Sequence, residues 1–125
     1  MRHERHYTLE QASAALPWVS ERLATMRSAR ERLTDAETRE ALSQAAPANG
    51  GGQPGKRVGE AFLVLRDGAA AFDQLDIVLR DLDRGLIDFP AIRDGREVYL
   101  CWIDGEPAIG FWHELDAGYA GRREL

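Results

Sequence analysis

The chain has 125 residues, a formal net charge of −5 and one cysteine, Cys101. This length predicts a single domain, 1–125, large enough to bury a core without metal or disulfide staples. The acidic balance argues against general nucleic-acid affinity, which needs a basic surface to neutralise phosphates. The single cysteine suggests a reducing compartment. No apolar run approaches the roughly 18 residues that span a bilayer, and the opening stretch, MRHERHYTLE, lacks the apolar centre of a secretion signal. These three features predict a cytoplasmic protein with no membrane partner.

Residues 8–45 are predicted to be helical. Thr8 and Gln11 have the spacing of a capping box, in which each side chain bonds the other residue's backbone amide at the start of a helix. The residues that follow are apolar at steps of three and four, the period of a seam between packed helices: Leu9, Ala12, Leu16, Val19, Leu23 and Met26. Pro17 interrupts this seam, so we expect a kink there within one helix.

Linker and capping signals divide the rest of the helical half. Thr34 and Glu37 offer a second capping box, which predicts a separate, weaker helix in the stretch that follows. Residues 46–55, APANGGGQPG, have the composition of a flexible linker. Residues 56–85 then keep the three-four step of a second helix, and Gly85 supplies the left-handed residue that ends helices.

Two long helices joined by such a linker should pack antiparallel as a hairpin. Gly68 lies in the middle of the second apolar seam. Because glycine has no Cβ, the backbone of the partner helix can approach closely at that point.

The last third of the chain predicts a β-meander over residues 86–113, followed by a tail at 114–125. Asp94-Gly95 and Asp104-Gly105 both suit two-residue type I′ turns, in which the central residues need φ > 0. Turns at those places give three antiparallel strands: 86–93, 96–103 and 106–113. One sheet face would then be wholly apolar and would have to cover the helices. The predicted fold class is therefore α+β, a long antiparallel helix hairpin packed on a three-stranded antiparallel β-meander.

The opposite face of this predicted sheet is mixed and suggests self-association. The register places there four residues that we predict to form an interface: Tyr99, Cys101, Ile103 and Trp112. Monomers seldom leave an apolar patch of this kind exposed. We therefore expect the C-terminal tail or a second subunit to cover it, and favour a homodimer.

Two blocks of the chain resemble a known family. The run LIDFPAIRDGREVYLCW, followed by GEPAIGFWHELDAGYAGR, is similar to the C-terminal block of a small bacterial family catalogued as domain of unknown function number two-two-zero-three. The opening YTLEQASAALPWV resembles the N-terminal helix of that family. The resemblance implies a bacterial cytosolic protein, and it brings no activity, ligand or catalytic residue to any position.

His113 is the best candidate for chemistry, because the run Trp112-His113-Glu114 lies where the third predicted strand leaves the sheet. Imidazole and carboxylate groups together can hold a divalent metal. The predicted metal ligands are His113, Glu114, Asp116, Asp88 and Glu97. Alternatively, His113 hydrogen-bonds a backbone carbonyl and ends the strand. In the predicted register Arg96 lies opposite His113, which would favour an anion over a cation.

The other reactive residue types carry weaker signals. Cys101 is next to Asp88 across the predicted ladder, and a neighbouring carboxylate discourages a thiolate, so a structural cysteine is favoured over a nucleophile. His3 and His6 have helical metal spacing but precede the helix cap, in a segment expected to be disordered. The run GGGQPGK lacks the preceding strand and the Lys-Ser/Thr ending of a phosphate loop.

Three classes of function remain open from the sequence. A non-enzymatic interaction or assembly module, homodimeric, accounts for the long helical seams and the apolar second face. A metal-binding protein with a site around His113 is the alternative. An enzyme that uses the same region is the third reading, but the sequence shows no nucleophile–base pair and no cofactor motif, so no cofactor other than a divalent metal is indicated.

Overall fold

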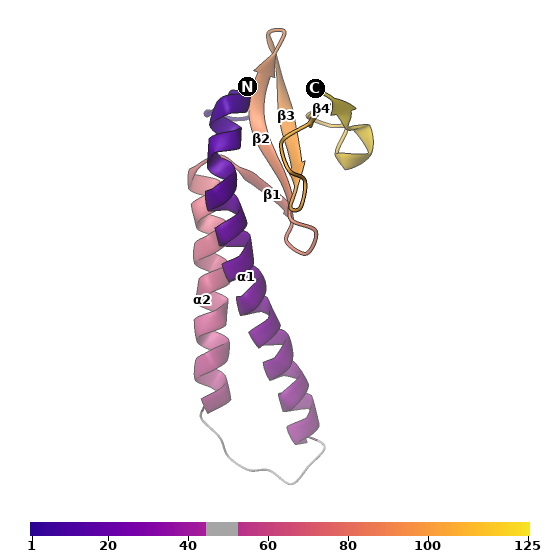
Figure 1. Ribbon diagram of the computed structural model, residues 1–125. Coiled ribbons are helices and arrows are strands. Elements are labelled where there is room, and N and C mark those ends of the chain that lie inside the picture. Colours follow the sequence, from indigo (N-terminus) through magenta and orange to yellow (C-terminus); the bar gives the residue numbers. More distant parts are fainter. Residues whose placement is uncertain (45–52) are drawn as a thin grey trace.

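The computed structural model describes residues 1–44 and 53–125, which form a helix hairpin beside an antiparallel sheet (Figure 1). Helix α1 spans Leu9–Gln44 and helix α2 spans Gln53–Gln74. The strands are β1 (Val78–Asp81), β2 (Leu86–Arg93), β3 (Arg96–Ile103), β4 (Phe111–Glu114) and β5 (Arg123–Glu124), with a short 3-10 helix at Tyr119–Gly121. Among the described residues, no helix is long and apolar enough to cross a membrane.

The first helix begins as the sequence predicts. The Thr8 amide donates to Gln11 Oε1 at 2.9 Å, and the Gln11 amide donates to Thr8 Oγ1 at 3.1 Å, so the capping box is complete. The chain then continues through Pro17 as one helix. The predicted second cap at Thr34 is wrong, because its hydroxyl donates to the Arg30 carbonyl one turn earlier, at 3.1 Å, as mid-helix threonines do.

The second helix ends earlier than predicted. Its apolar period continues to Leu82, but α2 stops at Gln74 and residues 78–81 form β1. The stop is a Schellman motif, in which the Ile77 amide donates to the Phe72 carbonyl while Asp76 has φ of 57°. Of the predicted linker 46–55, residues 46–52 lie outside the described residues and 53–55 belong to α2.

Within the described part of the chain, the sheet has five strands in the order β1-β2-β3-β4-β5, not three. The first predicted turn is confirmed, since Asp94 and Gly95 have φ of 51° and 76° and Arg93 pairs with Arg96. Gly85 does have a positive φ, of 66°, but it lies in the connection from β1 to β2 and ends no helix.

The second predicted hairpin is wrong in its register. A turn does join Ile103 to Glu106, but β4 resumes only at Phe111, after a wider loop. Tyr99 therefore lies opposite His113, where the sequence predicted Gly110. An odd register shift exchanges the two faces of a strand, so Trp112 joins the core and His113 turns to the second face.

The core lies between the helix hairpin and the first face of the sheet, as predicted. Its most deeply buried side chains come from α1, α2, β2 and β3, and include Val19, Leu23, Phe72, Ile87, Phe89 and Val98. Gly68 allows the two helices to approach, because a Cβ added there would lie 2.6 Å from Met26 Sδ. The predicted role of this glycine in close helix packing is thus confirmed.

The second sheet face is covered by both ends of the same chain. Residues 1–7, here called the N-terminal strap, contact this face through His3, whose Nε2 lies 2.6 Å from the Tyr99 hydroxyl, and reach the edge of β2, where the Tyr7 amide donates to the Pro90 carbonyl at 2.7 Å. At the other edge β5 pairs with β4. Of the predicted interface residues, Tyr99 and Cys101 are therefore buried on this face within one chain, Trp112 is buried in the core on the first face, and Ile103 is half-buried. The expectation of a disordered start around His3 and His6 is wrong, since both side chains hydrogen-bond residues of the folded domain.

Candidate metal centre

Three neighbouring strands bring together a buried cluster on the second face: Asp88 from β2, Cys101 from β3 and His113 from β4. One ligand atom of each lies within 4.8 Å of the others, and all three residues are buried. Asp88 and Cys101 are direct partners in the β2–β3 ladder. Alternation along β3 puts Tyr99, the partner of His113, on the same side as Cys101. We call Asp88, Cys101 and His113 the buried cluster.

His113 is fixed by two hydrogen bonds. Its Nδ1 lies 2.7 Å from the Glu114 carbonyl oxygen, and its Nε2 lies 2.9 Å from Asp88 Oδ1. A carbonyl can only accept, so Nδ1 carries a hydrogen. An ionised carboxylate can also only accept, so the space between Nε2 and Oδ1 must hold a proton or a metal cation. Burial alone would lower the pKa of His113, but the bonds to Asp88 and to the Glu114 carbonyl raise it above its ordinary value.

Arg80 holds the other oxygen of Asp88. Its Nε donates to Asp88 Oδ2 at 3.0 Å, and its guanidinium carbon lies 5.0 Å from the centre of the Tyr99 ring. The Asp88 side chain is 3% exposed, whereas that of Arg80 is 41% exposed. Arg80 thus anchors the carboxylate from the solvent side and leaves Oδ1 directed at His113.

Cys101 is a buried thiol beside that carboxylate. Burial raises the pKa of Cys101 to about 12, and the negative charge of Asp88 acts in the same direction. At neutral pH the side chain is therefore a thiol and a poor nucleophile, which agrees with the structural role expected from the sequence. Direct coordination by a metal cation is the kind of change that would remove its proton.

The N-terminal strap closes the face beside the buried cluster. His3 Nδ1 lies 2.6 Å from Asp76 Oδ1, and His3 Nε2 lies 2.6 Å from the Tyr99 hydroxyl. Burial opposes ionisation of Asp76, but His3 and the backbone amides of Arg5 and Glu4 hold its pKa below the ordinary value. The strap is therefore connected to Tyr99, which packs against the His113 ring with centroids 5.4 Å apart.

Glu97 anchors the strap. Its carboxylate accepts the backbone amides of Arg2 and His3 at 2.8 and 3.0 Å and contacts His6 Nε2 at 2.7 Å. Burial alone would raise the pKa of Glu97, but these hydrogen bonds lower it to about 2. Both of its oxygens are thus engaged with the strap.

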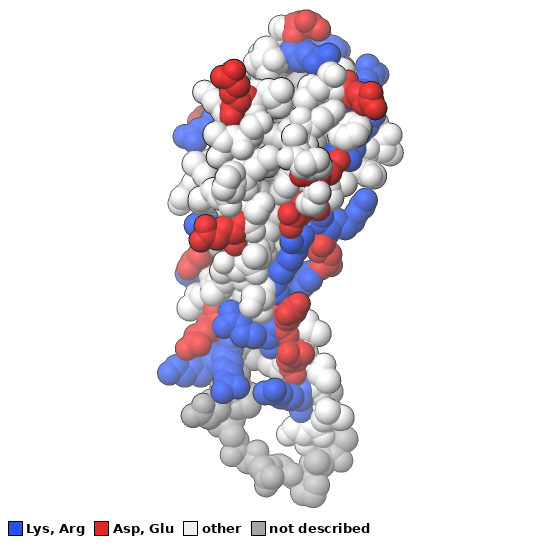
Figure 2. All heavy atoms as spheres, in the orientation of Figure 1, with Lys and Arg blue, Asp and Glu red and all other residues white. Residues whose placement is uncertain are grey.

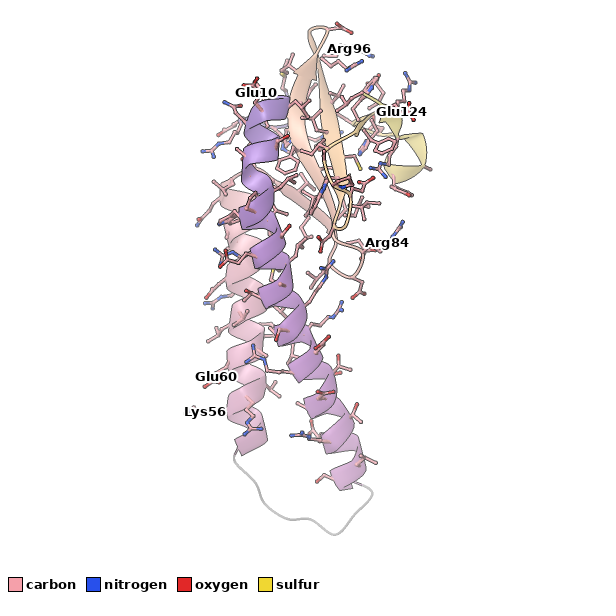
Figure 3. All side chains as sticks on the ribbon, viewed as in Figure 1. Glu10, Lys56, Glu60, Arg84, Arg96 and Glu124 are labelled. Carbon is pink, nitrogen blue, oxygen red and sulfur yellow. The ribbon has the colours of Figure 1, made fainter. Side chains whose placement is uncertain are left out.

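The structure unites only part of the predicted ligand set. His113 and Asp88 meet, whereas Glu114 pairs with Arg96 at 2.8 Å near the tip of the β2–β3 hairpin (Figure 3). Asp116 is 93% exposed and pairs with Arg2. The predicted position of Arg96 opposite His113 is wrong, because Tyr99 occupies it.

Sequence reasoning did not include Cys101 among the candidate metal ligands and did not place Arg80 beside Asp88. The pairing of Cys101 with Asp88 was already contained in the first predicted hairpin and is confirmed. Arg80 could not be found in this way, because residues 78–81 were assigned to a helix and form β1.

Comparison with known proteins places the chain in a family. The family model described as "Uncharacterized conserved protein (DUF2203)" matches residues 5–125. No curated protein and no solved structure matches the chain. The family model covers nearly the whole sequence, including both blocks of resemblance and the buried cluster, which lies within the C-terminal block, so the chain belongs to the DUF2203 family.

Proposed function

We propose that this protein binds a divalent transition metal, zinc in the first place, through Asp88, Cys101 and His113. The observation that carries the proposal is the meeting of a carboxylate oxygen, a thiol sulfur and an imidazole nitrogen within 4.8 Å at a buried position. Zinc accepts all three kinds of ligand, whereas calcium and magnesium take oxygen ligands.

The surroundings of the ligand atoms support this proposal. A metal-binding histidine usually donates its second ring N–H to a carbonyl or carboxylate, and His113 Nδ1 meets the Glu114 carbonyl at 2.7 Å. A binding carboxylate is usually hydrogen-bonded as well, and Arg80 provides that bond to Asp88 at 3.0 Å. The metal would take the place of the proton between His113 Nε2 and Asp88 Oδ1.

Charge balance is compatible with a dication. The Arg80 guanidinium repels an incoming cation, but an ionised Asp88 and a metal-bound Cys101 thiolate together supply two negative charges next to it. Among the described residues, this group contains no fourth side chain of the types that bind metals (histidine, cysteine, aspartate or glutamate). Zinc is commonly four-coordinate, so a position remains for water or a small ligand.

The test is the zinc content of tag-free protein after equilibrium dialysis against limiting zinc. Wild type should retain about one zinc ion per chain, and Cys101→Ser and His113→Ala should each lose it while keeping the wild-type circular dichroism spectrum. Asp116→Asn is the matched control, because it removes a predicted ligand that lies far outside the buried cluster. Equal zinc contents in wild type and both cluster variants would contradict the proposal.

The interaction-module function predicted from the sequence loses its original basis. Tyr99, Cys101 and Trp112 are buried by the chain itself and do not need a second subunit to cover them.

A further inference from the structure

One face of α2 is apolar at its centre and lacks a partner within the chain. The opposite face packs on α1 through Ala61, Gly68 and Phe72, which are buried. On the outer side Phe62 is 63% exposed and Leu63 is 45% exposed. Figure 1 shows that the lower half of the hairpin extends beyond the sheet, so the strands do not reach this surface.

Gly59 lies one helical turn before Leu63 on the same outer face. A Cβ added at Gly59 would meet nothing within 4 Å, so packing inside the chain gives no reason for a glycine there. Glycine inside a helix is destabilising relative to alanine. A low surface beside Leu63 is, however, what a large side chain from another helix would need in order to pack there.

Charged residues flank this apolar centre with opposite signs. Glu60 lies three residues before Leu63 and Arg66 three residues after it, and Figure 3 places Glu60 on the protruding part of α2. If two copies of α2 cross antiparallel with Leu63 on the two-fold axis, Glu60 faces Arg66 of the partner subunit, and the reverse pair forms by symmetry. Antiparallel helix dipoles also attract each other.

The present partner of Arg66 does not compete strongly with this arrangement. Arg66 pairs with Asp67, its neighbour in sequence, at 3.0 Å, and the side chains are 64% and 68% exposed. Exposed pairs of this kind contribute little to stability, so Arg66 can exchange its partner at small cost. Figure 2 shows charges of both signs over the lower part of the helices.

We propose that the protein self-associates as an isologous dimer through the outer face of α2, formed by Gly59, Glu60, Leu63 and Arg66, with Phe62 at its margin. The occupant of this face is a second copy of the chain, because the face is complementary to itself under a two-fold rotation. Leu63 of each copy meets Leu63 of the other on the two-fold axis, and Gly59 lies one helical turn away on the same face. This dimer interface does not include the buried cluster, so self-association and metal binding are independent proposals and can be tested separately.

Sedimentation equilibrium of the full chain from about 1 μM to about 1 mM tests the proposal. Wild type should approach twice the 13.9 kDa chain mass as concentration rises. Leu63→Glu should remain monomeric, with its helical circular dichroism unchanged. Leu42→Glu is the control, because Leu42 is 67% exposed but lies on α1, and it should dimerise as wild type does.

A charge exchange tests the antiparallel pairing. Glu60→Arg and Arg66→Glu should each weaken the dimer at least tenfold, and the double variant E60R/R66E should recover most of the wild-type affinity. The proposal is overturned by a wild type that stays monomeric across the whole range or by a dimer that Leu63→Glu leaves intact. A double variant weaker than either single variant would likewise overturn it.

Discussion

His113 Nε2 and Asp88 Oδ1 lie 2.9 Å apart at the centre of the second sheet face, with side chains that are only 1% and 3% exposed. The two residues come from β4 and β2, so β3 lies between them and their contact ties three strands together. A buried contact of this kind matters for stability as well as for binding, because a buried charge that loses its partner has no water to replace it.

Removing one member of this pair should destabilise the metal-free protein strongly. Asp88→Ala leaves His113 and Arg80 without their shared carboxylate, and breaking a buried pair in this way costs about 3–5 kcal/mol. The double variant Asp88→Ala/His113→Ala should lose less than the sum of the two single losses. Urea unfolding monitored by circular dichroism, with chelator present throughout, gives the free energies. Strict additivity would show that the pair does not act as a unit.

Glu97 should make the stability of the protein depend on acidity. Its folded pKa of about 2 lies below the ordinary value of 4.5, so the stabilisation is fully present above the unfolded pKa. It should decline as pH falls from about 4.5 towards 2 and the carboxylate that holds the strap becomes protonated. Thermal unfolding of Glu97→Gln should therefore show a smaller loss between neutral and acidic pH than wild type. Parallel pH profiles would contradict this assignment.

Gly68 should tolerate only small side chains. A Cβ there would lie 2.6 Å from Met26 Sδ, so Gly68→Val would force α1 and α2 apart or distort Met26, at a cost of about 1–3 kcal/mol. Met26→Ala opens space at the same contact, and the double variant should be less destabilised than the sum of the single variants. The free energies of unfolding can be compared from the urea midpoints if the slopes of the unfolding curves are unchanged. If the loss in the double variant equals the sum of the two single losses, Gly68 and Met26 do not clash with each other.

Replacing Gly95 with alanine should destabilise the protein more than replacing Gly110. Its φ is 76°, so Gly95→Ala strains the type I′ turn by about 1–2 kcal/mol. Gly110 has no such φ, and a Cβ there would meet nothing within 4 Å, so Gly110→Ala should be neutral or slightly stabilising. Thermal denaturation should separate the two variants by several degrees, and equal midpoints would refute the turn assignment.

The parts of the fold that the sequence predicts well are those fixed by local chemistry. The Thr8–Gln11 box and the Asp94-Gly95 turn depend on residues within one helical turn or one hairpin, and both are present. From that hairpin the Asp88–Cys101 pairing follows without further information. Two of the three members of the buried cluster were thus placed side by side by the sequence alone.

The end of α2 could not be predicted in the same way. Leu79 and Leu82 continue the helical period, yet they follow a stop at Asp76, which adopts φ of 57° where glycine or asparagine is usual. Both leucines pack against the core from outside α2, so the same apolar spacing serves two structures. As a result, the sequence did not predict β1 and did not place Arg80 in the sheet.

The register of the second hairpin was predicted wrongly because contacts distant in the sequence determine the loop after Ile103. The Glu106 side chain accepts the Ile103 amide at 2.7 Å and pairs with Arg122 at 2.8 Å, and the Trp102 indole donates to the Glu106 carbonyl. These contacts hold a wider loop after Ile103. The odd register shift that results brings His113 to Asp88, a contact that no tight hairpin could have revealed.

Absorption spectroscopy of the cobalt-substituted protein tests the metal centre most directly, because a bound thiolate gives Co²⁺ an intense near-ultraviolet charge-transfer band. The account predicts this band in wild type and in Asp116→Asn, its loss in Cys101→Ser, and strongly weakened cobalt binding in His113→Ala. Cobalt that binds without the thiolate band, or a band that survives in Cys101→Ser, would contradict a site formed by Asp88, Cys101 and His113.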